Sequence, residues 1–95
     1  MTIGPSTVVR RSDDQMSCKL NNEVAILNMS KSLYFGLGEV GAFVWDHIAT
    51  ETTVADLCRN VTERYDVEPS HCETDMIEFL EQLASASLLE TVSRP

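Results

Sequence analysis

The sequence predicts an α+β fold in which an N-terminal, three-stranded antiparallel meander is followed by three helices. Up to Leu37, apolar residues alternate or form short runs, as in strands, and after Gly38 they recur every three or four positions, as in helices. At 95 residues and 43% apolar content, the chain is long enough for one small core. We therefore expect one domain over residues 7–90, a flexible N-terminus at 1–6 and a polar tail at 91–95.

The strand pattern can be followed from one turn signal to the next. Residues 8–9 and the alternating segment 16–20 predict half-buried strands, and Asn21-Asn22 tolerates the positive φ of a tight hairpin. Residues 23–28 contain a continuous apolar run, which is typical of a central strand. The last strand, 33–37, has a sequence neighbour on one side only, so we expect it at the sheet edge. Its unpaired N–H and C=O groups could accept a foreign peptide as an added strand.

The helical part divides into three segments. The first helix is expected over residues 39–49, and Thr53-x-x-Asp56 predicts the capped start of a second that ends near Tyr65. Pro69 suits the first turn of a third helix. We expect that helix to bury an apolar stripe made of Cys72, Met76, Phe79, Leu80 and Leu83. Its exposed face is expected to be acidic and to carry Glu73, Asp75, Glu78 and Glu81.

Charge and composition exclude several classes of partner. The net charge is −8, and no Lys or Arg lies between Ser70 and Ser87, so we expect no nucleic-acid partner. No apolar run is long enough for a membrane span or a signal peptide, and the three cysteines form no C-x-x-C motif. The sequence therefore predicts a cytoplasmic protein without a membrane partner.

The candidate reactive residues are more simply structural. His71, Cys72 and Cys58 lack a third ligand or an orienting carboxylate, and no phosphate loop or catalytic triad setting is present. Trp45 is most simply a core anchor. We therefore expect no metal, no cofactor and no enzymatic activity.

Several short motifs in order resemble the PqqD-like family. They are Tyr34-Phe35-Gly36-Leu37, a Gly41-x-x-x-Trp45 helix, Thr53-x-x-x-Leu57, Tyr65-Asp66-Val67 and Leu88-Leu89, and together they cover nearly everything after Thr7. The chain departs from the family pattern at Gly38, where Asn is common. The resemblance implies a winged helix-turn-helix-like fold and a RiPP recognition element, a domain that binds the leader peptide of a ribosomally made precursor.

The resemblance also implies how a leader would bind and where it would be taken. The leader would add as a strand to the edge strand, against the third helix, and pass to a maturation enzyme, most simply a lasso-peptide leader protease. Two alternatives remain: a peptide chaperone for a radical SAM enzyme in quinone-cofactor biosynthesis, and a winged-helix DNA-binding regulator. The acidic residues of the third helix could attract Lys or Arg in the leader. The candidate leader-binding residues are Leu33, Tyr34, Phe35, Gly36, Leu37, Asp75, Met76, Glu78, Phe79, Leu80 and Leu83.

Overall fold

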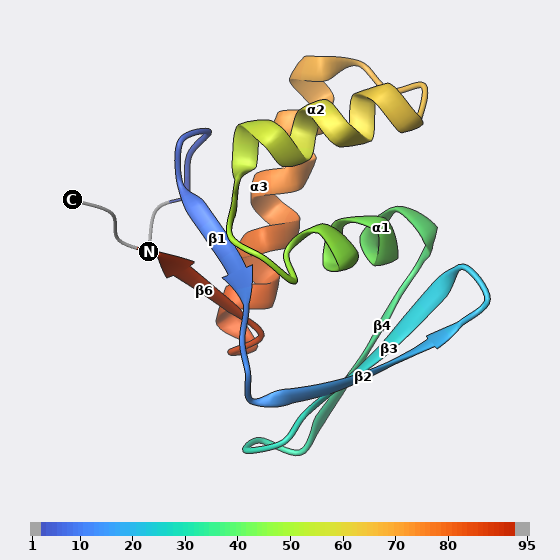
Figure 1. Ribbon diagram of the computed structural model, residues 1–95, viewed down its shortest axis with the longest axis vertical. Helices are drawn as coiled ribbons and strands as arrows, with labels where there is room; N and C mark the ends of the chain where they lie inside the picture. Colours follow the sequence, from blue (N-terminus) through green and yellow to red (C-terminus); the bar gives the residue numbers. More distant parts are fainter. Residues whose placement is uncertain (1–2, 93–95) are drawn as a thin grey trace.

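The computed structural model describes residues 3–92, which form two small antiparallel sheets and three helices (Figure 1). The predicted α+β class, the meander and the three helices are confirmed. No helix among the described residues is long and apolar enough to cross a bilayer. The elements in chain order are β1 (Val8–Arg11), β2 (Gln15–Leu20), β3 (Glu23–Asn28), β4 (Leu33–Leu37), α1 (Glu39–His47), β5 (Thr52–Thr53), α2 (Val54–Arg64), α3 (Pro69–Ser85) and β6 (Leu89–Val92).

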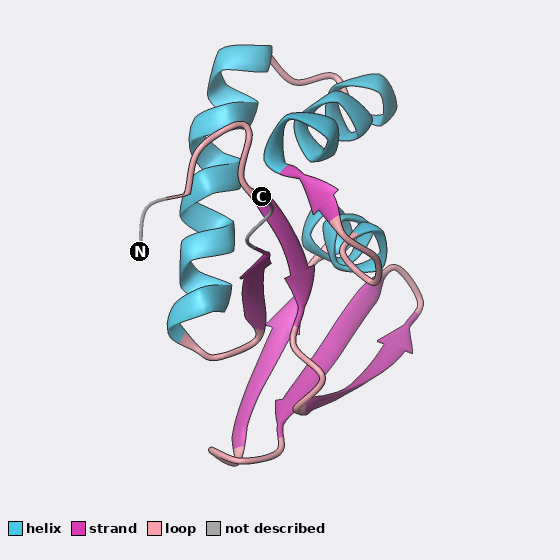
Figure 2. Ribbon diagram, turned by 60° about the vertical axis from the view of Figure 1, so that its left-hand side comes forward, coloured by secondary structure: helices cyan, strands magenta, loops and turns pink. Residues whose placement is uncertain are grey.

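The meander has the strand order β2-β3-β4, so β3 is central and β2 and β4 are the terminal strands. Alternate residues of β3, namely Val24, Ile26 and Asn28, are buried, because α1 lies over this face of the sheet. The opposite face points away from the helices (Figure 2). The hairpin between β2 and β3 turns at Asn21, whose φ of 61° confirms the predicted positive-φ position.

A second sheet, with the order β5-β1-β6, was not predicted. The strand expected at residues 8–9 is present as β1, and Val8 lies opposite both Thr53 and Val92. Strand β5 is only two residues long, and the sequence of β6 contains Glu90 and Thr91, so neither has the apolar alternation of a strand. Their pairing depends on contacts between distant parts of the chain, which a local pattern does not reveal.

Both predicted domain boundaries are corrected by the structure. Ile3 is 4% exposed and belongs to the core, and the N–H of Ala55 donates to the carbonyl of Pro5 at 2.9 Å. The expected flexible segment 1–6 is therefore wrong from Ile3 onward. At the other end, Thr91 and Val92 pair with β1 as part of β6 rather than forming a tail. Residues 1–2 and 93–95 lie outside the described part of the chain.

The helix ends follow recognisable local chemistry. Thr53 caps α2, since its Oγ1 accepts the N–H of Asp56 at 3.1 Å, and Pro69 occupies the first turn of α3, both as predicted. α1 ends at His47, two residues before the expected end. At the end of α3 the N–H groups of Ser87 and Leu88 donate to the carbonyls of Ala84 and Leu83, which is the pairing of a Schellman motif. This turn directs the chain back toward the core.

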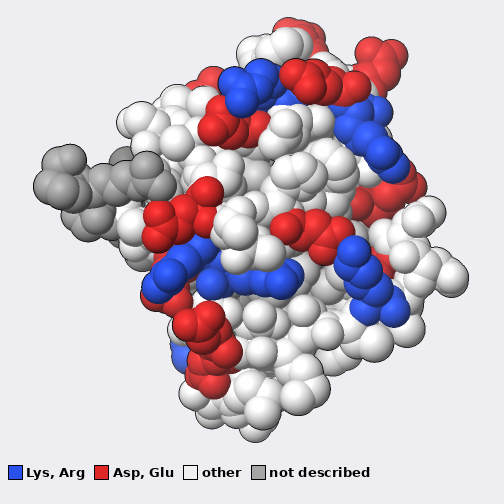
Figure 3. All heavy atoms as spheres, viewed as in Figure 1, with Lys and Arg blue, Asp and Glu red and all other residues white. Residues whose placement is uncertain are grey.

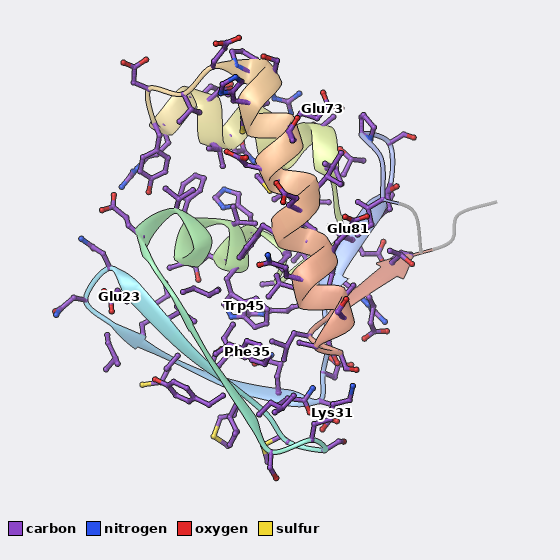
Figure 4. All side chains as sticks on the ribbon, turned by 180° about the vertical axis from the view of Figure 1, so that it is seen from behind. Glu23, Lys31, Phe35, Trp45, Glu73 and Glu81 are labelled. Atoms are coloured by element: carbon purple, nitrogen blue, oxygen red, sulfur yellow. The ribbon has the colours of Figure 1, made fainter. Side chains whose placement is uncertain are left out.

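The core lies between the helices and the buried face of the meander. Trp45 on α1 is 1% exposed, in agreement with its expected role as a core anchor, and the Arg11 guanidinium lies 5.1 Å from the centre of its ring. Figure 4 shows Trp45 and Phe35 on the same side of the meander, between β4 and the helices. The fully buried apolar side chains include Val9, Ile26, Ile48, Val54, Leu57, Leu80 and Leu88.

Candidate functional site

The edge of β4 is free of backbone pairing over the described residues. β4 pairs with β3 from Leu33 opposite Asn28 to Leu37 opposite Val24, and it ends the sheet on its other side. In an antiparallel ladder the N–H and C=O groups of alternate residues point to the same side. The five residues of β4 therefore present backbone donors and acceptors that a further strand could pair with.

A groove of about 570 Å³ lies between β4 and the C-terminal half of α3. Its strand wall is apolar and consists of Leu33 and Phe35, while its helix wall is mostly polar and acidic and consists of Glu78, Glu81, Gln82, Ser85 and Ala86. Leu33 is 44% exposed, whereas Phe35 is half-buried and packs on the core. An extended segment in this groove would contact apolar side chains on one side and carboxylates on the other.

A second hollow, of about 530 Å³, lies beside the N-terminal half of α3. Its interior is mainly apolar, with Val40 and Val44 from α1 and Val61 from α2, and its rim carries Glu68 and Asp75. The remaining lining residues are Gly41, Val67, His71, Cys72, Met76 and Phe79. This hollow could take a bulky apolar side chain whose neighbour in sequence is a cation.

Phe79 marks the point on α3 where the two hollows approach each other. It lines the second hollow, and the adjacent Glu78 lines the groove. A Cβ placed on Gly41 would lie 3.2 Å from the Leu37 Cβ and 3.6 Å from the Phe79 ring. The absence of a side chain at Gly41 thus lets α1 approach both β4 and α3, which is a physical reason for glycine in the Gly41-x-x-x-Trp45 motif.

The structure separates the predicted leader-binding residues into five groups. Leu33, Phe35 and Glu78 line the groove, and Asp75, Met76 and Phe79 line the second hollow. Leu37 is half-buried between β4 and α1, and Gly36 is exposed on the strand. Tyr34 points to the opposite face of the sheet and is 70% exposed. Leu80 and Leu83 are 0% and 3% exposed, so they support α3 from the core and do not line either hollow.

The groove also contains residues that sequence reasoning missed. Glu81, Gln82, Ser85 and Ala86 line it together with Glu78, and none of them was a candidate. They follow Glu78 at helical spacings of three, four, seven and eight residues. The helical period therefore indicates that they lie on the same face of the helix as Glu78. The apolar stripe, which is the predicted wall, faces the core and the second hollow.

One buried polar side chain fixes the end of the groove near Leu33. Asn28 is 0% exposed, its Nδ2 donates to the carbonyl of Ala86 at 2.8 Å, and its Oδ1 accepts the N–H of Lys31 at 2.9 Å. The first bond joins β3 to the end of α3, and the second holds the turn that leads into β4. Because Leu33 and Ala86 line opposite walls, Asn28 sets their separation.

Cys72, which lines the second hollow, lies beside Cys58. Sγ of Cys72 lies 3.8 Å from the carbonyl of Cys58, and burial together with the neighbouring Cys72 raises the pKa of Cys58 from 9.0 to about 12. A thiol with such a pKa is protonated and poorly reactive at neutral pH. No group of three or more His, Cys, Asp or Glu residues within residues 3–92 is placed to hold a metal ion.

Comparisons with known proteins identify one matching family and several solved structures of the same fold. The model of the family described as Coenzyme PQQ synthesis protein D (PqqD) matches residues 23–89. This range begins at β3 and includes β4, the three helices and the first residue of β6. None of the curated protein sequences matches the chain significantly.

Three solved structures have the same fold. The first, TbiB1 in complex with the TbiA(beta) leader peptide, is 28% identical, with a TM-score of 0.82 over 90% of this chain and 99% of that one. A lasso peptide synthetase B1 complexed with its leader peptide is 17% identical, with a TM-score of 0.77 over 86% and 96%. The third, the PqqD part of Methylobacterium extorquens PqqCD, described as a stand-alone RiPP recognition element, is 22% identical, with a TM-score of 0.77 over 94% and 95%.

Proposed function

Because the chain belongs to the PqqD family, we propose that it is a RiPP recognition element that binds the leader peptide of a ribosomally synthesised precursor in the cytoplasm. The leader adds as a strand to the free edge of β4 and lies against α3. The domain then delivers the precursor to a maturation enzyme, which we take to be a lasso-peptide leader protease. The domain itself recognises a peptide and carries out no chemistry.

The observation that carries this proposal is the unpaired edge of β4 beside a groove. Backbone pairing gives affinity for extended peptides in general, and side-chain pockets give selectivity. Here the edge of β4 supplies the backbone pairing, and the groove and the second hollow supply the side-chain pockets. The 28% identity to TbiB1, which was solved with a leader peptide, supports a peptide as the occupant.

The energetics allow useful affinity. Each added backbone hydrogen bond contributes about 0.5–1.5 kcal/mol net, and each buried apolar side chain contributes about 1.5–3 kcal/mol. Ordering a disordered segment costs about 2–5 kcal/mol, and association has a further cost. Backbone pairing alone is therefore insufficient, and one or two apolar anchors of the leader determine whether it binds.

The proposed leader-binding residues follow from this placement. We assign backbone pairing to Leu33, Tyr34, Phe35, Gly36 and Leu37. Side-chain contacts are assigned to the lining residues of the groove, which are Leu33, Phe35, Glu78, Glu81, Gln82, Ser85 and Ala86, and to three lining residues of the second hollow, which are Asp75, Met76 and Phe79. Leu80 and Leu83 act indirectly, since they hold α3 in position from the core.

A second candidate function differs only in the enzyme that receives the peptide. The family match is to a protein of coenzyme PQQ synthesis, which supports a chaperone for a radical SAM enzyme as the alternative. A DNA-binding regulator is disfavoured, because α3 carries acidic residues and no Lys or Arg. Cleavage of a precursor by the protease, measured with and without this domain, separates the protease from the radical SAM setting.

Leader binding can be tested by fluorescence anisotropy. The probes are labelled leaders of precursors encoded near this chain's gene, together with the TbiA(beta) leader. We expect Phe79→Ala to weaken binding about 10- to 100-fold, because it removes one apolar anchor. Phe43→Ala is the matched control, since Phe43 is also half-buried but lines neither hollow and packs on His47 and Tyr65.

A second arm addresses the backbone pairing. A leader N-methylated at alternate residues loses the N–H groups that point toward β4, and it should bind much more weakly than a leader methylated at the other residues. Equal affinity of the two methylated leaders, or equal affinity of wild type and Phe79→Ala, would contradict strand addition in this groove.

A further inference from the structure

The face of the β2–β4 sheet that points away from α1, called the outer face below, is apolar and exposed. Its apolar side chains are Met16, Cys18, Leu20, Ala25, Leu27, Met29 and Tyr34. Met16 lies opposite Leu27 and Leu27 opposite Tyr34, so these three form one row across the strands. They are 61%, 39% and 70% exposed. No described element covers this row, and large exposed apolar patches of this kind mark interaction sites.

The charge of the molecule leaves this face nearly neutral. Three acidic and two basic residues lie between Ser12 and Gly38, so this part of the chain carries a net charge of only −1 out of −8. The remaining negative charge lies on the β1–β5–β6 side and on the helices. In Figure 3 charged side chains crowd the upper and middle parts of the face shown, and the lowest part, over the meander, is mostly uncharged. Two such faces can approach each other without strong repulsion.

We propose that the outer face pairs with the outer face of a second copy of this chain. Interfaces between different, separately stable proteins are about as polar as the rest of the surface, whereas homodimer interfaces are more apolar. The phenol of Tyr34 and the carboxylate of Glu23 are the only strongly polar side-chain groups that the register places on this face. A face with so few polar groups fits an identical apolar face better than a polar partner.

The size of the face favours a weak pairing over a stable one. Its exposed apolar surface is on the order of 500 Å² per copy, within the range of functional patches. Two copies would bury roughly 1,000 Å², which is below the size of most stable complexes. The dimer is therefore weak and depends on concentration. Leu27 belongs to the central strand and to the row that it forms with Met16 and Tyr34. A two-fold axis near Leu27 would therefore bring this row of one copy into contact with the same row of the other copy.

The dimer leaves the edge of β4 free, and Tyr34 links the two surfaces. Its backbone lies in the edge strand, while its side chain lies on the outer face. A leader strand paired with β4 would point every second side chain to the same face of the sheet as Tyr34, and these side chains would enlarge the outer face. This coupling, unlike the dimer itself, rests on the proposed leader binding. Leader binding and dimerisation should then strengthen each other by the same factor.

Sedimentation velocity on the full chain, without leader, tests the dimer. We expect the average mass to rise from 10.6 kDa toward twice that value as the protein concentration increases from about 10 μM to about 1 mM. The double variant Leu27→Thr with Tyr34→Thr introduces β-branched residues, which favour strands, and should raise the dissociation constant at least 10-fold. Val67→Thr changes an exposed apolar residue that lines the second hollow and lies off the sheet, and without leader it should leave the dissociation constant of the dimer unchanged.

Cys18 provides a native reporter of the same contact. It is exposed on the outer face, whereas Cys58 is half-buried and Cys72 is buried. Its rate of alkylation should fall several-fold at the higher concentration in wild type but not in the double variant. Circular dichroism establishes that the variants are folded.

Two outcomes would overturn the proposal. One is a monomer at every concentration, which would leave the outer face for another protein. The other is a dimer in which Cys18 reacts at the monomer rate, since pairing through the β4 edges would leave the outer face exposed. Neither result depends on whether a leader binds, so failure of the dimer and failure of leader recognition are distinguishable.

Discussion

Asn28 is the described residue whose side chain ties the candidate site to the rest of the fold. It is buried among apolar side chains, and both ends of its amide bond backbone groups near the groove. A buried amide is costly unless it is paired, so the position is occupied by a residue that satisfies two backbone groups at once. Its role is to position Leu33 and Ala86 rather than to contact a peptide.

Replacement of Asn28 tests this role. Asn28→Ala leaves the Ala86 carbonyl and the Lys31 N–H without their partner, and we expect the free energy of unfolding to fall by about 1–3 kcal/mol. Urea denaturation followed by circular dichroism measures the change. Asn22→Ala, at an exposed turn position, should alter stability by less than about 0.5 kcal/mol. A similar loss in both variants would show that the two bonds contribute little.

Cys58 makes stability depend on pH in the alkaline range. Its pKa is about 12 in the folded protein, raised from 9.0 chiefly by burial. Above pH 9 the unfolded chain therefore loses this proton before the folded chain does, and ionisation favours unfolding. The stabilising contribution is complete below pH 9 and is lost as the pH rises toward 12.

The measurement is the free energy of unfolding against pH for wild type and for Cys58→Ala. We expect the wild-type curve to fall more steeply above pH 9, because the variant lacks this titrating group. Cys18→Ala should retain the steeper fall, since this variant keeps Cys58. Parallel curves for wild type and Cys58→Ala would argue against a raised pKa at Cys58.

At the scale of elements, the end of α3 is held in a conformation that serine tolerates poorly. Ser87 has a φ of 62°, the left-handed conformation that a Schellman motif requires after the helix. Glycine usually occupies this position, because a Cβ is unfavourable there. The turn at Ser87 nevertheless brings Leu88 into the core, where it is 0% exposed.

Ser87→Gly should therefore stabilise the protein, by about 0.5–1 kcal/mol, through relief of the left-handed strain. The matched substitution Ser85→Gly lies within α3 and should destabilise by a similar amount, because glycine lowers helix propensity. Thermal unfolding of the two variants gives the comparison. The interpretation fails if Ser87→Gly lowers the melting temperature.

The elements that sequence predicted are those whose signal is local. The meander, the Thr53 cap and the start of α3 at Pro69 each depend on a few neighbouring residues. The strands β5 and β6 were missed because their pairing with β1 is long-range, and Ile3 was missed because a single apolar residue has no periodicity. Local pattern therefore identified the meander and the helices but not the sheet that joins the two chain ends.

The candidate site was predicted in a similarly uneven way. The edge position of β4 followed from chain order, and the structure has it as the terminal strand. The face of α3 that borders the groove did not follow, because an amphipathic stripe indicates which side chains are apolar and not which neighbour they meet. Leu80 and Leu83 are in the core, and Glu81 and Gln82 lie at the groove. Only the placement of α3 against β4 distinguishes these roles.

For the whole molecule, the net charge of −8 has a kinetic consequence. Asp75 lies at the second hollow and Glu78 at the groove, so a leader that carries Lys or Arg would be attracted to both. We expect Asp75→Lys with Glu78→Lys to lower the association rate several-fold at low salt, with a smaller effect at high salt. Stopped-flow fluorescence with a labelled basic leader measures this rate.

The control for charge steering is a pair of equal charge changes elsewhere. Asp13→Lys with Glu63→Lys adds the same positive charge at exposed residues that line neither hollow. Association rates should then remain closer to those of wild type. An association rate that is the same for both pairs, or that does not vary with salt, would exclude local steering by Asp75 and Glu78.

The antiparallel pairing of β1 with β6 has a practical consequence for engineering. Val8 sits opposite Val92, so the start of β1 and the end of β6 lie next to each other. A domain whose N- and C-terminal segments lie close together can be inserted into a surface loop of an unrelated host protein without distorting the host. Since β4 belongs to the other sheet, its edge should stay open in such a fusion protein. The host would then carry a binding site for the peptide that this domain is proposed to recognise.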